Sequence, residues 1–170
     1  MERKPELRLP TTAVPVTVQL IGGTKVDAEV FVGEAARTGH SQLLDDVASM
    51  LDEGAGFLPV RVAREVQLYA KKAILYVAIV RHDEADVDHE EFEDVPSEVL
   101  TLYDRQHYVK VELAAGALTG MLFDSSPSDR TRVIDHLNSA GRFLRLWTEG
   151  THYLINKDQI IRVSEQERTS

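Results

Sequence analysis

The sequence has no cysteine, which excludes disulfide bonds, thiolate metal sites and cysteine nucleophiles. It also has no run of about 18 apolar residues, the length that a membrane-spanning helix needs. The first ten residues, MERKPELRLP, carry charges and prolines but lack the apolar stretch of a secretory signal. From these absences we expect a cytoplasmic protein that has no membrane segment.

Basic residues are outnumbered in this chain of 170 residues, which has 19 Lys and Arg, 28 Asp and Glu, and a net charge of −9. Nine of the acids lie between His82 and Glu98, a stretch without any Lys or Arg, and the remaining 19 acids equal the bases in number. The acidity therefore belongs to a linker, predicted at residues 81–107, with a short helix that begins near Pro96. The linker is expected to be solvated.

Two alternating stretches near the N-terminus predict a pair of strands. Apolar residues occupy every second position in Val14–Leu20 and again in Val26–Val32, as in strands that are buried on one face. The Gly22-Gly23 pair between them is typical of a hairpin turn. A helix is expected between Ser41 and Gly54. Three further strands are expected at Phe57–Val60, Val66–Tyr69 and Ile74–Val80.

The chain contains an internal duplication. The stretch VQLYAKKAILYV at Val66–Val77 returns as HYLINKDQIIRV at His152–Val163, an offset of 86 residues, and the earlier elements recur in the same order. This predicts two units, at residues 13–80 and 108–164, between a flexible arm at 1–12 and a tail at 165–170. Units this short bury only about 60% of their unfolded surface, so we expect the two copies to pack face to face.

The stretch VTVQLIGGTKVDAEVF, followed by LYAKKAILYV, resembles the Sm-like barrel family, and most of all the bacterial Sm-like RNA chaperones. Tyr69, Lys71 and Ile74 stand where that family closes its barrel, and Ile155, Lys157 and Ile160 do so in the second unit. The resemblance implies a mainly β (α+β) fold of two tandem, pseudo-symmetric SH3-like or Sm-like barrels. Each barrel would carry an inserted helix.

The family resemblance also implies RNA binding, but the sequence departs from the family in two respects. A helix interrupts the middle of each unit, whereas Sm-like proteins carry their helix before the first strand. The Lys-His pair of the family's closing turn is replaced by Lys71-Lys72 and Lys157-Asp158. Units with balanced charge also lack the electropositive face of a typical RNA binder, so nucleic acid is an alternative rather than the first expectation.

No motif identifies a reaction. Gly22-Gly23-Thr24-Lys25 joins two strands rather than a strand and a helix, so it predicts a turn and no phosphate loop. Asp135 cannot orient the adjacent His136 as a catalytic triad requires, because neighbouring helical residues point about 100° apart. Asp45 and Asp135 correspond between the units and are expected to bond backbone N–H groups. We therefore expect no enzyme activity.

We expect no cofactor and no metal site either. His82, Asp86, Asp88 and His89 include residue types that bind divalent metals, but their stretch has little apolar content to hold such a site rigid. A solvated linker is the preferred interpretation of these residues, and docking on a basic partner is the alternative.

The predicted function is that of a non-enzymatic adaptor or assembly protein, which binds another protein through a barrel edge or the groove between the repeats. An Sm-like module that binds RNA or single-stranded nucleic acid is the alternative, and a homo-oligomer is left open. The candidate partner-binding residues combine aromatic and basic side chains: Trp147, Tyr153, Lys71, Lys72, Lys157 and Arg145.

Overall fold

The computed structural model describes residues 11–33, 40–54, 56–80, 107–122, 132–138 and 141–166. Residues 81–106 of the predicted linker, including its expected helix and the histidine and aspartate residues considered for metal binding, lie outside this range. The first strand begins at Thr11, inside the stretch expected to be an arm. Within the described residues the fold is mainly β, which confirms the coarse prediction of the fold class.

The described strands and helices follow the order that the sequence predicts for each unit. The first half comprises β1 (Thr11–Leu20), β2 (Lys25–Gly33), α1 (His40–Asp52), β3 (Phe57–Val62), β4 (Glu65–Ala70), the 3₁₀ turn η2 (Lys71–Ala73) and β5 (Ile74–Val80). The second half comprises β6 (His107–Leu113), β7 (Gly116–Leu122), α4 (Val133–Leu137), β8 (Phe143–Thr148), β9 (Thr151–Asn156), the 3₁₀ turn η3 (Lys157–Gln159) and β10 (Ile160–Glu165).

The described strands form one antiparallel sheet with the order β10-β6-β7-β8-β9-β5-β1-β2-β3-β4. The first half of the chain supplies β5-β1-β2-β3-β4, and the second half repeats this order as β10-β6-β7-β8-β9. The sheet does not close on itself, because among the described strands β4 and β10 each pair on one side only. The closed form of the two predicted barrels is therefore not found.

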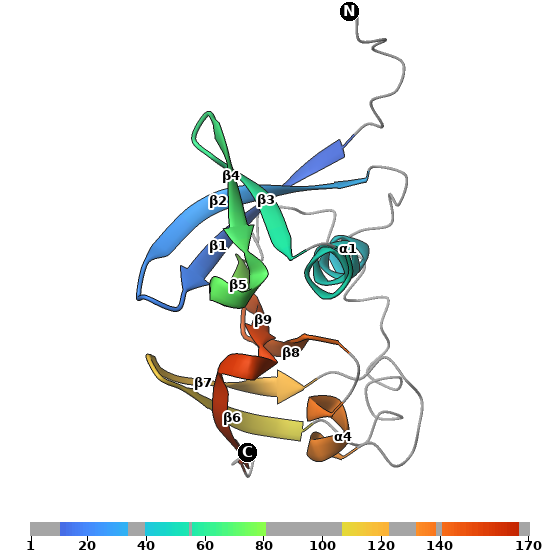
Figure 1. The fold of residues 1–170 in the computed structure, drawn as a ribbon. Coiled ribbons are helices and arrows are strands. Elements are labelled where there is room, and N and C mark those ends of the chain that lie inside the picture. The colour runs from blue at the N-terminus through green and yellow to red at the C-terminus, as the bar shows by residue number, and fades with distance from the viewer. Residues whose placement is uncertain are drawn as a thin grey trace, which may run out of the picture.

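The two halves meet edge to edge rather than face to face, which corrects the expectation from the sequence. Strand β5 of the first half pairs with β9 of the second, with Val77 opposite Leu154. In Figure 1 this contact lies where the green end of the first half meets the red strands of the second. The edge of a sheet carries unpaired N–H and C=O groups, so this pairing satisfies backbone groups that face-to-face packing would leave open.

Two hydrophobic clusters lie on either side of this joint, and each receives side chains from the other half. Phe143 and Leu154 of the second half belong to the cluster of the first half, beside Ile74 and Val77. In return, Leu75 of the first half is buried in the cluster of the second. The joint therefore buries apolar side chains of both halves.

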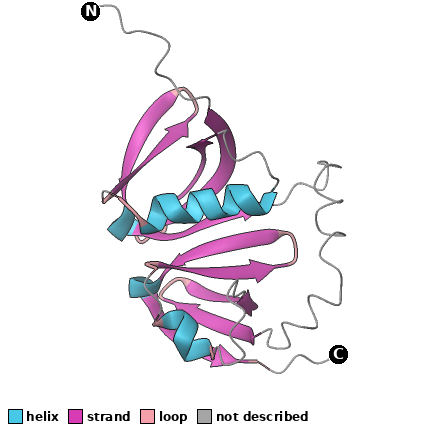
Figure 2. Cartoon of the chain, turned by 90° about the vertical axis from the view of Figure 1, so that its right-hand side faces the viewer, coloured by secondary structure: helices cyan, strands magenta, loops and turns pink. Residues whose placement is uncertain are grey.

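Helix α1 covers the first cluster with one apolar face. Val47, Ala48 and Leu51 of this helix are all buried, whereas Asp45, two residues before Val47, is exposed. The helix lies across the level at which the two halves meet (Figure 2). The corresponding helix of the second half, α4, has only 5 residues against 13 in α1. In the part of the chain that is described, neither helix has the length and apolar character needed to cross a membrane.

Gly120 allows β7 to approach β8 closely. A Cβ atom at this position would lie 2.5 Å from the backbone oxygen of Trp147 and 3.0 Å from Cγ of Leu146. Backbone atoms of a paired strand cannot move aside without disturbing the pairing of Met121 with Trp147. Glycine at this position is thus a steric requirement of the sheet.

We predict that Gly120→Ala lowers the free energy of unfolding by about 1–3 kcal/mol, the usual cost of overpacking a well-packed site. The measurement is urea denaturation of both proteins. Gly33→Ala is the matched control, because a Cβ at Gly33 would meet no atom within 4 Å and should leave the stability nearly unchanged. Equal stability of the two variants would contradict this role of Gly120.

Candidate partner-binding surfaces at the open sheet edges

The residues that cross the joint have counterparts at the two open edges of the sheet. With the offset of 86 residues, Leu68 corresponds to Leu154 and Phe57 to Phe143, while Ile161 corresponds to Leu75. The residues at the joint are 2%, 6% and 4% exposed for Leu154, Phe143 and Leu75. Their counterparts Leu68, Phe57 and Ile161 are 65%, 59% and 68% exposed. The same positions of the repeat are therefore buried at the joint and exposed at the open edges of the sheet.

The open edge of β4 also offers backbone hydrogen-bonding groups. Pro59 of β3 lies opposite Leu68 of β4 and has no N–H, so this pair cannot exchange two hydrogen bonds across β3 and β4. In an antiparallel ladder the groups of such a pair point away from each other. The N–H and C=O of Leu68 are thus directed to the open side, and so, two residues earlier, are those of Val66, whose side chain is 66% exposed.

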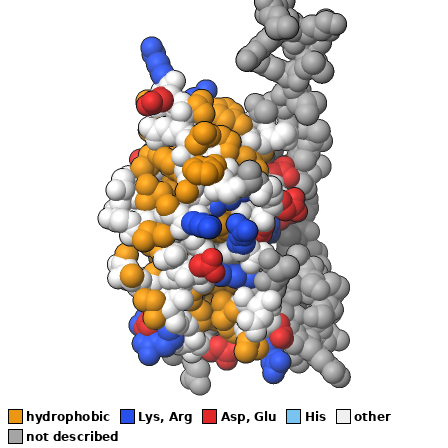
Figure 3. All heavy atoms as spheres, in the orientation of Figure 1, with side chains coloured by type: hydrophobic (Ala, Val, Ile, Leu, Met, Phe, Trp, Pro, Cys, Tyr) orange, Lys and Arg blue, Asp and Glu red, His pale blue; other side chains and the backbone are white. Residues whose placement is uncertain are grey.

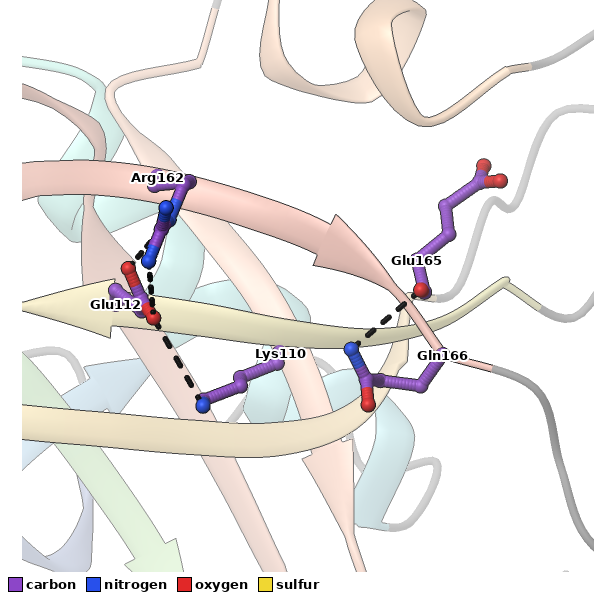
Figure 4. A network of polar contacts seen from close by, with 5 residues as sticks. All are labelled: Lys110, Glu112, Arg162, Glu165 and Gln166. Carbon is purple, nitrogen blue, oxygen red and sulfur yellow. Dashed lines mark hydrogen bonds and ion pairs between the residues drawn. The ribbon is translucent and has the colours of Figure 1, made fainter.

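The open edge of β10 carries a charged pair beside its apolar residue. Arg162 donates two hydrogen bonds to the carboxylate of Glu112 on β6, at 2.6 and 2.9 Å (Figure 4). The hydrogen bond from Arg162 lowers the pKa of Glu112, burial opposes this change, and the positive charges of Arg162 and Lys110 add to the lowering. Lys110 lies 3.8 Å from the same carboxylate (Figure 4). Arg162 is therefore engaged with the neighbouring strand β6.

Two sets of polar contacts reinforce the joint between the halves. Oδ1 of Asp52, the last residue of α1, accepts hydrogen bonds from the backbone N–H groups of Arg142 and Phe143, at 2.9 and 3.0 Å. Nδ2 of the buried Asn156 donates to the carbonyl oxygen of Ile74 on β5, at 3.0 Å. At the equivalent of Asn156, strand β4 has Ala70, whose side chain cannot form this bond.

Lys71 and Lys157 occupy the two 3₁₀ turns, and both interact electrostatically with Asp52. Nζ of the buried Lys71 donates to the carbonyl oxygen of Glu53 at 2.8 Å. Burial lowers the pKa of Lys71, the positive charge of Arg142 adds to this, and Asp52 opposes it. Burial likewise lowers the pKa of Lys157, and Asp52 again opposes the shift. Both lysines are therefore only partly accessible to a partner, and burial disfavours their charged form.

The other candidate residues are divided between the joint and the surface. Trp147 and Tyr153 are both half-buried: the Trp147 ring is stacked 5.8 Å from that of His152, and the Tyr153 ring contacts Tyr76 edge to face at 5.2 Å. Lys72 is exposed. Arg145 is exposed but forms a salt bridge with Asp45 of α1. The structure thus brings Lys71, Lys157 and Arg145 near the joint and does not gather the six candidates into one surface.

The two aspartates that correspond between the units play different roles. Asp135 of α4 accepts a hydrogen bond from the backbone N–H of Arg132 at 2.9 Å, as the sequence predicts for a residue that caps a turn. Asp45 instead pairs with Arg145 across the joint. Within the described residues no group of three His, Asp or Glu side chains is arranged to hold a metal ion.

Sequence reasoning missed the exposed apolar residues at the open edges, among them Phe57, Leu68 and Ile161. In Figure 3 apolar side chains gather over the part of the molecule where Figure 1 draws β3 and β4, and a group of Lys and Arg side chains lies directly below them. The signal was present in the duplication, because these residues are the copies of residues that the joint buries. Their exposure depends on the strand order, which local patterns do not specify.

We predict that Asp52→Ala weakens the joint, because two backbone N–H groups lose their charged acceptor. The expected loss in unfolding free energy is about 1.5 kcal/mol, measured by urea denaturation. Asp52→Asn keeps an oxygen in the place of Oδ1 and should retain most of the stability. An Asn variant as unstable as the Ala variant would indicate that charge, rather than these hydrogen bonds, is what Asp52 supplies.

We also predict a pH dependence from Lys71. Because the folded-state pKa lies below the ordinary value of 10.5, the unfolded chain binds more protons between these two values, so stability rises with pH across that window. Below the folded-state pKa the full cost of burying the charge is present. The wild type should therefore gain unfolding free energy relative to Lys71→Met as the pH increases from neutral toward 10.5. A constant difference between the two proteins would contradict the prediction.

Comparisons with known proteins do not assign this chain to a family. No family model, no curated protein and no solved structure matches it. The resemblance to Sm-like barrels therefore stays an expectation from the sequence. The geometry of the joint and of the two open edges is the basis on which a function can be argued.

Proposed function

We propose that this protein is a non-enzymatic assembly protein that binds another polypeptide through the open edges of its sheet. In this proposal the two halves are tandem, pseudo-symmetric units of the small-barrel type, each left unclosed with a helix inserted between its second and third strands. The observation that carries the proposal is the exposure of Leu68, Phe57 and Ile161 at positions whose copies are buried by strand pairing at the joint. A bound strand would bury them in the same way.

Backbone and side-chain features support the same mode of binding. An extended segment that adds to a sheet edge gains affinity from main-chain hydrogen bonds, and pockets for alternate side chains give selectivity. Strand β4 offers both, since the N–H and C=O of Leu68 face outward and its side chain is exposed beside Phe57. Natural proteins usually protect a sheet edge with charge, proline or a covering element. An apolar open edge is thus better explained as a binding surface.

The alternative, binding of single-stranded nucleic acid, has weaker support. A nucleic-acid groove combines accessible cations with aromatic rings on which bases stack. Here Lys71 is buried, Arg145 and Arg162 are paired with carboxylates, and Trp147 and Tyr153 are half-buried against other rings. The observations therefore favour a protein partner over nucleic acid.

Site-specific photocrosslinking in native cells tests the proposal. A photoreactive amino acid replaces Leu68 or Ile161 at the two edges. Ile21 serves as the control because it is an exposed apolar residue of similar size (46% exposed) that follows the inner strand β1 rather than belonging to an edge strand. We expect protein crosslinks from the edge positions and at most weak ones from Ile21. Crosslinks of equal yield at all three positions, or crosslinks to nucleic acid alone, would contradict edge binding.

A further inference from the structure

We propose that the polypeptide bound at these edges is a second copy of this chain, with β4 of one copy paired antiparallel to β10 of the next. This inference rests on the proposed function and names its partner. The chain already contains one contact of this kind, in which β9 of the second half pairs with β5 of the first. The intermolecular contact would repeat it with the corresponding strands of two molecules.

The internal joint defines the register of the proposed contact. Leu154 of β9 lies opposite Val77 of β5. Moving the β9 residue back by 86 positions and the β5 residue forward by 86 places Leu68 of one copy opposite Val163 of the other. The outward-facing N–H and C=O groups of Leu68 are then in the place of those that Leu154 directs to β5. The backbone of β4 is thus prepared for the partner strand in this register.

The exposed apolar side chains fit the same arrangement. Within the chain, Phe143 and Leu154 enter the hydrophobic cluster of the neighbouring half. Phe57 and Leu68 of one copy would enter the second cluster of the next copy in the same manner. In exchange Ile161, like Leu75 at the joint, would enter the first cluster of the copy that it meets. Three large apolar residues that are now 59–68% exposed would be buried by one contact.

The location of both interacting surfaces on one chain argues for self-association rather than for a foreign partner. The β4 edge is a copy of the β9 edge, and the β10 edge is a copy of the β5 edge, and those two fit each other in the joint. A foreign strand would have to be complementary to one of these edges independently. A second copy supplies complementarity to both edges at once.

The contact between copies is expected to be weaker than the joint inside the chain. Ala70 cannot form the hydrogen bond that Asn156 makes with the carbonyl of Ile74, and with the same offset the charged Asp52 is replaced by the neutral Asn138, which lies just after α4. At the place of the Tyr76–Tyr153 ring contact, the copies would bring together Arg162 and Gln67. Assembly should therefore depend on protein concentration.

The contact is heterologous, which determines the form of the assembly. A pair of copies joined by one contact still has one free β4 and one free β10, so further copies can add. Such head-to-tail contacts produce a closed ring if the rotation between copies closes, and a filament if it does not. Symmetric dimers, in which the same edge meets itself, are not expected.

Sedimentation of the full chain over a range of concentrations tests the proposal. The wild type is expected to form species with more than two copies of the 19.0 kDa chain. Leu68→Pro removes the outward N–H of β4, a change that an edge strand tolerates, and Ile161→Lys places a charge on β10. Each variant alone should sediment as a monomer, while Ile21→Lys, the control outside both edge strands, should assemble like the wild type.

A mixture of the two variants gives the sharper result. Leu68→Pro retains a functional β10 edge, and Ile161→Lys retains a functional β4 edge, so the mixture should form a dimer of one copy each and grow no further. This recovery excludes misfolding as the reason for the monomers. A monomeric wild type at every concentration would overturn the proposal, and so would variants that stay monomeric when mixed.

The outcomes separate this inference from the proposed function. If the wild type is monomeric but Leu68 and Ile161 still crosslink to other proteins in cells, edge binding holds and self-association fails. If neither edge position crosslinks to any protein, the proposed function fails together with the inference. Crosslinked products at twice the mass of the chain would support both.

Discussion

The pairing of β5 with β9 is the contact on which the rest of this structure depends. It joins two five-stranded halves into one sheet and supplies hydrogen bonds to two edges that would otherwise be open. It also allows Phe143, Leu154 and Leu75 to cross into the cluster of the opposite half. Each half is small for an independent domain, and the exchange of apolar side chains adds buried area to both. The edge, and not the face, is where these halves depend on each other.

Much of the fold follows from local patterns in the sequence. Alternating apolar residues predict the strands, the stripe of Val47 and Leu51 predicts α1, and Gly23, with φ of 94°, occupies the predicted turn. The prediction that the two halves pack face to face is wrong, because they meet through the edge strands β5 and β9. Strand order joins residues about 80 positions apart, such as Val77 and Leu154, and no short-range pattern encodes that choice.

The candidate site was less predictable than the fold. Aromatic and basic residues were chosen from the sequence because such residues are common at interfaces, yet Trp147 and Tyr153 are half-buried and Lys71 is buried. Leu68 and Leu154 are the same amino acid at the same position of the repeat, yet Leu68 is exposed and Leu154 is buried. Burial here is decided by the neighbouring strand, so the identity of the residue alone carries no information about it.

The two 3₁₀ turns have diverged in a way that makes the halves chemically distinct. Lys71-Lys72-Ala73 carries two positive charges, whereas Lys157-Asp158-Gln159 carries one of each sign. The helices differ as well, with thirteen residues in α1 and five in α4. Covalent linkage fixes these unlike halves in strict alternation, so any larger object built from the chain contains an even number of them. The two kinds of half can therefore differ in surface chemistry, as in a complex of two different gene products, although a single gene encodes both.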